Sequence, residues 1–264
     1  MEFNYIAGYF LAVLVGVSLG LIGSGGSILT VPILVYILAI EPVLATAYSL
    51  FVVGSSALVG GVNKALQKDV YFNIVAVFGI PSLLSAYAVR AFVIPAVPDI
   101  LYTNDLLTIS KSLALMLLFA VVMLVASIRM IKSKPLSDEA STVSYIRLSI
   151  LGVFTGMLSG AVGAGGGFLI IPALVFLARI PMKKAVGTSL FIVALQSLAG
   201  FTGDVFQREI EWEFLLSFTA TAIIGIFFGT YLAKKIEGKK LKIIFGWFIL
   251  VMAIYILVKE LFLS

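Results

Sequence analysis

The sequence predicts an all-α polytopic membrane protein, and its composition, its apolar runs and an internal repeat support this prediction. Of the 264 residues, 61% are hydrophobic and only 12% are charged, and the mean hydropathy is +1.17. Soluble domains are about 45–50% apolar and about 25% charged, so this chain has too little polar surface for a water-soluble globule. The apolar runs do not alternate between apolar and polar residues, which disfavours a β-barrel.

Apolar segments follow one another along the whole chain, five in each half. The segment that starts at residue 5 lacks a preceding basic stretch and a cleavage site, so we expect it to stay in the protein as a membrane segment. A polar stretch separates the halves and predicts a first transmembrane repeat at 1–131, a linker at 132–144 and a second transmembrane repeat at 145–264. The segments lie approximately at 5–22, 27–40, 44–63, 71–92, 106–130, 145–162, 167–179, 185–205, 214–233 and 241–262.

An internal repeat relates the two halves. Residues 20–60 and 160–200 share 16 identities in 41 positions without a gap. The centre of the repeat is a glycine-rich loop, Gly-Ser-Gly-Gly-Ser at 23–27 and Gly-Ala-Gly-Gly-Gly at 163–167, and Pro32 and Pro172 follow the two loops at the same distance. Repeats of this kind indicate that one structural unit occurs twice.

The basic residues predict the orientation in the membrane. Of the 18 Lys and Arg, 14 fall in loops on one side, and only Arg90, Lys111, Arg208 and Lys259 fall on the other. Because cytoplasmic loops carry the excess of Lys and Arg, we predict a protein of the cytoplasmic membrane with a cytoplasmic linker and both termini extracytoplasmic. Each half has an odd number of segments, so the second copy should be upside down. This predicts two inverted-topology repeats, as in many secondary transporters.

Two of the segments are too short to cross a membrane as straight helices. At about 1.5 Å per residue, segment 27–40 spans about 21 Å, whereas the hydrocarbon core is about 30 Å thick. Segment 167–179 is shorter still, and Pro32 and Pro172 weaken both helices. The sequence therefore predicts short broken helices, whose glycine loops either dip toward mid-membrane or form re-entrant hairpins.

The glycine loops predict a site for a small anion. The first turn of a helix has free backbone N–H groups and about half a positive charge, and an anion would satisfy these groups inside lipid. The alternative is that glycines only permit close helix packing, which we favour for the isolated Gly16, Gly152 and Gly229. The substrate-binding residues predicted from the loops are Gly23, Ser24, Gly25, Gly26, Ser27, Gly163, Ala164, Gly165, Gly166 and Gly167.

Polar side chains in the third segment of each half extend this predicted site. Ser49, Thr188, Ser189 and Gln196 could donate hydrogen bonds to an oxyanion, although Ser and Thr in membrane helices often bond to their own backbone instead. Asp204, at the end of segment 185–205, is a candidate for proton coupling because an acid inside a membrane is costly and often functional. Its alternative role is that of a helix end at the membrane interface.

Composition also limits the chemistry. The chain has no Cys and no His, which excludes disulfides, iron–sulfur clusters and thiolate chemistry and removes the commonest metal ligand. We predict no cofactor, no metal site and no enzymatic activity. The net charge of +5 follows membrane topology and does not indicate nucleic-acid binding. The predicted partners are the lipid bilayer and a small anionic substrate, and a homodimer is left open.

The duplicated element Gly-x-Gly-Gly-[Ser/Gly]-x-Leu-x-[Val/Ile]-Pro, with Gly-Thr-Ser-Leu-Phe at 187–191, resembles the TauE/SafE sulfite exporter family of the toluene-sulfonate uptake permease group. The first copy departs from this pattern at Ala47-Tyr48, where Gly-Thr is expected. The resemblance implies a secondary transporter, expected to be an exporter, of sulfite or an organosulfonate such as sulfoacetate in bacteria or archaea. A passive anion channel and a proton-coupled importer of a sulfur or carboxylate anion are the alternatives.

Overall fold

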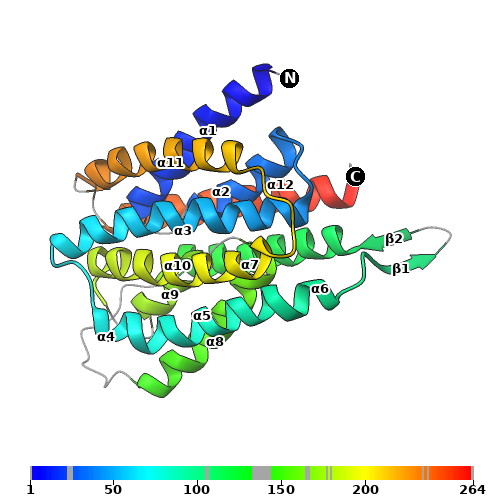
Figure 1. Cartoon of the computed structure of the whole chain (residues 1–264). Coiled ribbons are helices and arrows are strands. Elements are labelled where there is room, and N and C mark those ends of the chain that lie inside the picture. The colour runs from blue at the N-terminus through cyan, green and yellow to red at the C-terminus, as the bar shows by residue number, and fades with distance from the viewer. Residues whose placement is uncertain are drawn as a thin grey trace.

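The computed structural model of the chain is a bundle of long helices (Figure 1). It describes residues 2–22, 26–104, 107–132, 144–163, 167–176, 178, 180–233, 235–236 and 238–262. Within these residues, six helices are long and apolar enough to cross a membrane. Large apolar side chains such as Phe10, Phe92, Phe154 and Phe228 are exposed on the outside of the bundle, as a lipid-facing surface requires. The predicted all-α polytopic membrane protein is thereby confirmed.

The five segments of each half appear in the expected order. The first half consists of α1 (Glu2–Ile22), α2 (Gly26–Pro32), the π-helical η1 (Ile33–Ile37), α3 (Pro42–Leu66), a fourth helix from Phe72 to Ala96, strands β1 (Ile100–Asn104) and β2 (Leu107–Ser110), and α7 (Lys111–Lys132). The second half consists of α8 (Tyr145–Val162), α9 (Gly167–Phe176), α10 (Met182–Val205), α11 (Trp212–Ala233) and α12 (Gly238–Phe262).

The fourth helix is built of five consecutive pieces that contain two π-helical turns. The pieces are α4 (Phe72–Ile74), η2 (Val75–Gly79), α5 (Ile80–Ala88), η3 (Val89–Val93) and α6 (Ile94–Ala96). Each π turn ends two residues before a proline, Pro81 or Pro95. A proline cannot donate to the carbonyl four residues earlier, and inside a membrane that carbonyl needs another donor. For Pro81 the freed carbonyl belongs to Val77, and the hydroxyl of Ser149 on α8 donates to it at 3.0 Å.

Two expectations for segment boundaries are wrong. Segment 106–130 does not begin as a helix, because Leu107–Ser110 pairs with Ile100–Asn104 as an antiparallel hairpin. The β-branched Thr108 and Ile109 suit a strand better than a helix start. Segment 71–92 also continues as a helix to Ala96. The two short helices are present, since α9 ends at Phe176 and α2 with η1 ends at Ile37.

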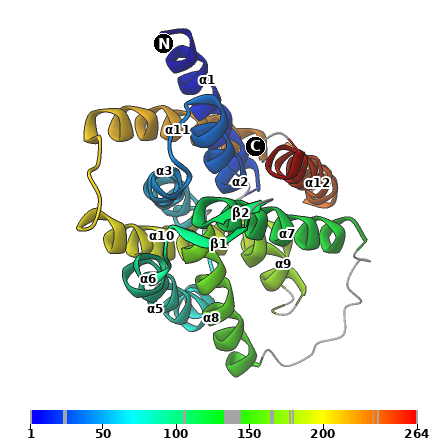
Figure 2. The ribbon, with the colours of Figure 1, turned by 90° about the vertical axis from the view of Figure 1, so that its right-hand side faces the viewer.

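The helices of the two halves pack in a symmetric pattern. Helix α3 packs against α10, and α7 packs against α12. Helix α1 packs against α11, and in the same way α8 packs against the fourth helix. Figure 2, which looks along the bundle, shows α1 and α11 on one side of α3 and α10, and α5 and α8 on the other. In Figure 1, α3 and α10 run in opposite directions, and so do α7 and α12. Exchanging the halves therefore reproduces the same helix pairs.

The backbone hydrogen bonds that end the two short helices also recur 140 residues apart. The N–H of Ile40 donates to the carbonyl of Leu34 at 2.9 Å, and the N–H of Ile180 donates to the carbonyl of Leu174 at 3.2 Å. Helices α2 and α9 contact each other. The repeat seen in the sequence thus corresponds to a repeat in local structure.

Isolated glycines lie where helices approach most closely. A Cβ on Gly16 of α1 would come 1.8 Å from the carbonyl oxygen of Ala222 on α11, and one on Gly229 would come 2.1 Å from that of Val17. On α8, a Cβ on Gly152 would come 2.4 Å from the carbonyl oxygen of Phe78. The expectation that these glycines permit close packing, as small residues do in membranes, is confirmed.

Candidate functional site

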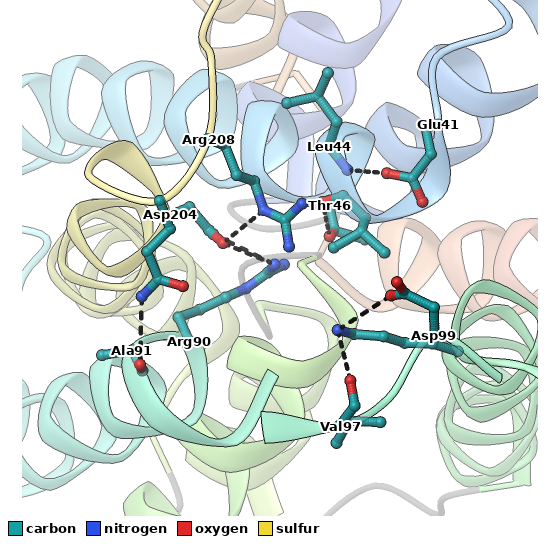
Figure 3. Close-up of polar contacts among 12 residues, drawn as sticks. Glu41, Leu44, Thr46, Arg90, Ala91, Val97, Asp99, Asp204 and Arg208 are labelled. Carbon is teal, nitrogen blue, oxygen red and sulfur yellow. Dashed lines mark hydrogen bonds and ion pairs between the residues drawn. The ribbon is translucent and has the colours of Figure 1, made fainter. Parts of the chain in front are cut away.

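The most unusual polar cluster in the described part of the chain is a buried ion-pair group of two arginines and one aspartate (Figure 3). Nη1 of Arg90, on η3, lies 3.3 Å from Oδ2 of Asp204 at the end of α10. Nε of Arg208 lies 3.5 Å from the other carboxylate oxygen. The side chain of Arg90 is fully buried, that of Asp204 is 2% exposed and that of Arg208 is 26% exposed. We call these three residues the Arg90 cluster.

Arg90 has more hydrogen-bond donors than partners. Its Nε and Nη2 atoms are buried and have no hydrogen-bond partner among the described residues. An unpaired buried donor costs about 1–3 kcal/mol, and more when the group is charged. Arginine stays charged at any physiological pH, so this residue cannot avoid the cost by losing its proton. The guanidinium therefore keeps two nitrogen atoms whose hydrogen-bonding capacity is unused among the described residues.

Nη2 of Arg90 lies against Gly163, the first residue of the second glycine-rich stretch. A Cβ on Gly163 would lie 2.7 Å from Nη2 of Arg90 and 2.2 Å from Cβ of Thr46 on α3. Gly163 ends α8 with φ +72°, a left-handed conformation that glycine adopts without strain. Helix α9 begins four residues later at Gly167, so the positive end of its dipole faces this loop. A guanidinium and a helix N-terminus thus flank the same loop.

Local sequence fixes the position of Arg90. It lies in the π turn Val89–Val93, and π turns are frequent at functional sites. Pro95 cannot donate to the carbonyl of Ala91, and Nε2 of Gln207 donates to that carbonyl instead at 3.3 Å. Gln207, just after α10, therefore holds the backbone beside Arg90, and Asp204, at the end of α10, holds its side chain, as Figure 3 shows for Ala91 and Asp204.

The predicted loop residues are only partly described. Gly23, Ser24, Gly25, Ala164, Gly165 and Gly166 lie outside the described residues, as do residues 133–143 of the predicted linker at 132–144. Gly26 and Ser27 begin α2, Gly167 begins α9, and Gly163 lies against Arg90. The role of these loops in binding an anion stays a prediction.

The polar residues predicted in α3 and α10 have different surroundings. Ser49 is buried, and its hydroxyl has no partner among the described residues. Ser49 follows Thr46 by three positions, so it lies on the same face of α3 one turn further inward. Ser189 donates to the carbonyl of Val186 in its own helix at 2.9 Å, and the buried Gln196 accepts a hydrogen bond from Ser82. Of these residues, only Ser49 offers a hydroxyl without a partner close to the Arg90 end.

Thr188 and Tyr48 have equivalent contacts in the two halves. The hydroxyl of Thr188 accepts from the backbone N–H of Tyr71 at 3.0 Å, just before the fourth helix begins. The hydroxyl of Tyr48 accepts from the backbone N–H of Glu211 at 2.9 Å, just before α11 begins. Both donor and acceptor are 140 positions apart in the two pairs. The departure from the Gly-Thr pattern at Tyr48 therefore preserves the contact.

The structure does not bring all predicted residues together. Thr188 of α10 contacts Tyr71, just before the fourth helix begins. Gly163, at the end of α8, lies beside Arg90, near the other end of the fourth helix. Nineteen residues separate these points on the helix, which is about 28 Å. Arg90 was not among the predicted site residues, because its position in the sequence placed it with the basic residues of the extracytoplasmic loops. An arginine at the end of an apolar segment was the signal that could have found it.

Among the described residues, no group of three or more carboxylates could hold a metal ion. The Arg90 cluster is instead suited to anions, because a guanidinium presents several donors to an oxyanion in a fixed plane. Two guanidiniums and one carboxylate leave the cluster with a net charge of +1. This net charge is of the sign that attracts an oxyanion.

Comparison with known proteins gives the family of the chain. A family model described as "Sulfite exporter TauE/SafE" matches residues 9–256. This chain belongs to the TauE/SafE family.

Relatives of this TauE/SafE protein carry the name "Probable membrane transporter protein". One from Xylella fastidiosa is 29% identical over 252 residues, covering 92% of this chain and 91% of its own. One from Methanocaldococcus jannaschii is 27% identical over 276 residues, covering 97% and 98%, and one from Bacillus subtilis is 26% identical over 257 residues, covering 89% and 90%. No solved structure matches the chain. The family and its named relatives identify a membrane transporter.

Proposed function

We propose that this TauE/SafE protein is a secondary transporter that exports a small sulfur-containing anion, sulfite or an organosulfonate such as sulfoacetate. The observation that carries the proposal is the fully buried Arg90, whose Nε and Nη2 atoms lack partners among the described residues. The name of the family supports the sulfur anion. Sulfite and sulfonate groups present oxygens that match a guanidinium.

The anion site would lie between Arg90 and the loop that follows Gly163. Nη2 of Arg90 lies against Gly163, and Ser49 adds an unpaired hydroxyl one turn further inward. The loop at 163–167 would add backbone N–H groups at the start of α9. The first glycine loop would serve the equivalent position in the other half.

Transport would proceed by movement of one repeat against the other, with the two repeats inverted in the membrane. The opposite directions of α3 and α10 and the symmetric helix pairs support this proposal. Such repeats exchange two equivalent packings when access alternates between the two sides. Export needs no coupling, because a membrane potential that is negative inside drives an anion outward by about 2.3 kcal/mol per charge per 100 mV.

The test is flux of radiolabelled sulfite and sulfoacetate in proteoliposomes, with and without a pH gradient. We expect saturable efflux of at least one of the two and acceleration of labelled efflux by unlabelled anion on the opposite side. A passive channel would give neither saturation nor this counterflow. Flux of a cation in the absence of flux of either anion would refute the proposal.

A proton-coupled importer of a sulfur or carboxylate anion is the second candidate, because the buried Asp204 could carry the proton. In the same vesicles, an inward proton gradient would then drive accumulation of the anion against its own gradient. Export predicts that a pH gradient does not drive accumulation of a monovalent anion such as methanesulfonate, whose flux follows its own gradient and the membrane potential.

A further inference from the structure

The charge balance of the Arg90 cluster carries an inference about which anions it accepts. Arg90 and Asp204 are almost fully buried, and Arg208 is three-quarters buried. Two guanidiniums and one carboxylate sum to +1, so one negative charge is missing from the cluster. A net charge in a poorly solvated site is costly, and a bound anion of charge −1 would neutralise it.

We propose that this cluster binds a monovalent oxyanion as it stands and binds a divalent oxyanion only together with one proton, which the carboxylate of Asp204 takes up from the solvent. This inference rests on the proposed anion site. With a divalent anion the cluster would otherwise reach −1. Protonation of Asp204 returns the sum to zero, and the protonated carboxyl can still accept a hydrogen bond from Arg90 through its second oxygen.

The surroundings of Asp204 leave it as the group that can change charge. From η3 it faces Arg90, and from the segment after α10 it faces Arg208. Arginines do not lose their protons in this range. On α3 the neighbour of the cluster is the neutral Thr46, whose hydroxyl donates to the carbonyl of Val43 at 2.7 Å.

Glu41 and Asp99, the other carboxylates that Figure 3 labels, are engaged elsewhere. Glu41 accepts from the N–H of Leu44 at 2.9 Å and from Ser112 at 3.0 Å. Nζ of Lys111 donates to the carbonyl of Val97 at 3.0 Å and lies 3.9 Å from the exposed Asp99. These groups have their own partners. Within the Arg90 cluster, Asp204 is the residue that can gain or lose a proton.

The consequence for transport is that both classes of anion would carry the same net charge. A monovalent anion moves alone and carries −1. A divalent anion moves with one proton and also carries −1. The membrane potential would therefore drive both classes equally, whereas the pH would affect the divalent anions alone.

The test uses methanesulfonate and sulfate, because the first is monovalent and the second divalent across the neutral range. Calorimetric titration of the purified protein in two buffers with different ionisation enthalpies counts the protons taken up on binding. We expect about one proton for each sulfate and none for methanesulfonate. Sulfate affinity should rise with falling pH toward about tenfold per pH unit, the limit for one linked proton, while methanesulfonate affinity stays flat.

The decisive variant is Asp204→Asn, which fixes the cluster at +2. We expect sulfate to bind without proton uptake and the ratio of sulfate to methanesulfonate affinity to rise at least tenfold. Asp99→Asn is the matched control, since it removes an exposed carboxylate from the ion pair with Lys111 and should change neither quantity.

A second variant keeps the inference testable if Asp204→Asn does not fold. Arg208→Gln changes a residue that is 26% exposed and sets the cluster to zero, so methanesulfonate should then bring about one proton with it. Binding of both anions with no proton uptake in any variant would overturn this inference and leave the anion site standing. Failure of the wild-type protein to bind or transport any anion would refute the proposed function itself.

Discussion

At the scale of single residues, Arg90 combines full burial with incomplete hydrogen bonding. Its Nη1 pairs with Asp204 at 3.3 Å, while its Nε and Nη2 atoms lack partners among the described residues. A purely structural ion pair is usually satisfied on all sides, because a half-satisfied buried charge is worse than an apolar core. Arg90 therefore has one role that the structure shows, the ion pair with Asp204, and one that we propose, the binding of an anion by its open donors.

These two roles can be separated by mutation. Arg90→Gln should abolish anion transport and also lower the thermal midpoint, because removal of one partner of a buried pair costs about 3–5 kcal/mol, part of which Arg208 offsets at 3.5 Å. The double variant Arg90→Gln with Asp204→Asn removes the unpaired carboxylate and should recover most of the stability but none of the transport. Thermal unfolding in detergent and flux in proteoliposomes measure the two effects. Wild-type transport by the double variant would show that Arg90 has only a structural role.

At the scale of elements, each half uses a hydroxyl of its third helix to fix the start of a helix in the other half. Thr188 on α10 holds the start of the fourth helix through Tyr71, and Tyr48 on α3 holds the start of α11 through Glu211. The two side chains differ in size, but their oxygens accept from equivalent N–H groups. This interlocks α3 and α10 with the helices that follow in the opposite half.

Removing either hydroxyl should destabilise the protein. Tyr48→Phe and Thr188→Val each remove one part-buried hydrogen bond to a backbone N–H, which is worth about 0.5–1.5 kcal/mol. The losses should be similar, since the contacts are equivalent. Thr202→Val is the control, because this exposed hydroxyl donates only to the carbonyl of Ala199 in its own helix, and the change should stay within about 0.5 kcal/mol. Thermal unfolding in detergent checks all three. A neutral Tyr48→Phe beside a costly Thr188→Val would contradict the equivalence.

Element boundaries were predictable where local signals are strong. The bounds of α8 follow from the sequence because Ser144 accepts from the N–H of Arg147 at its start and Gly163 adopts positive φ at its end. The strand Leu107–Ser110 was missed because Leu107 and Ile109 lead directly into the apolar residues of α7. The end of the fourth helix was missed because an arginine at the end of an apolar segment resembles a residue at a membrane surface. Arg90 is instead buried within the helix bundle.

At the scale of the whole molecule, the repeat predicted the order of the helices but not the Arg90 cluster. Arg90 and Asp204 lie 114 positions apart, so no local pattern joins them. The offset of 140 relates Asp204 to Lys64 and Arg90 to Thr230, and neither of these preserves the charge of its equivalent. The cluster is thus a departure from the symmetry of the repeat. Only the packing of the fourth helix against α10 brings its members together.

The orientation of the molecule decides which side of the membrane the Arg90 cluster faces. Arg90 and Asp204 lie near the ends of the fourth helix and of α10, the ends that lead toward the hairpin and toward α11. The distribution of Lys and Arg predicts that this end is extracytoplasmic. The chain has no Cys, so single cysteines can report the accessibility of each end. Asp99, next to the hairpin, is 99% exposed, and Leu66, at the other end of α3, is 81% exposed.

We expect a membrane-impermeant maleimide to label Asp99→Cys in intact cells and to label Leu66→Cys only after the membrane is broken. The physical reason is that Leu66 lies between the basic Lys64 and Lys68, and loops rich in Lys and Arg lie on the cytoplasmic side. Labelling both variants before and after lysis controls for differences in reactivity. The reverse pattern would place the Arg90 cluster at the cytoplasmic end, and equal labelling in intact cells would indicate two orientations. Either result would contradict the predicted orientation. With the reverse pattern, an anion leaving the cell would meet the Arg90 cluster at the start of its path and not at the end.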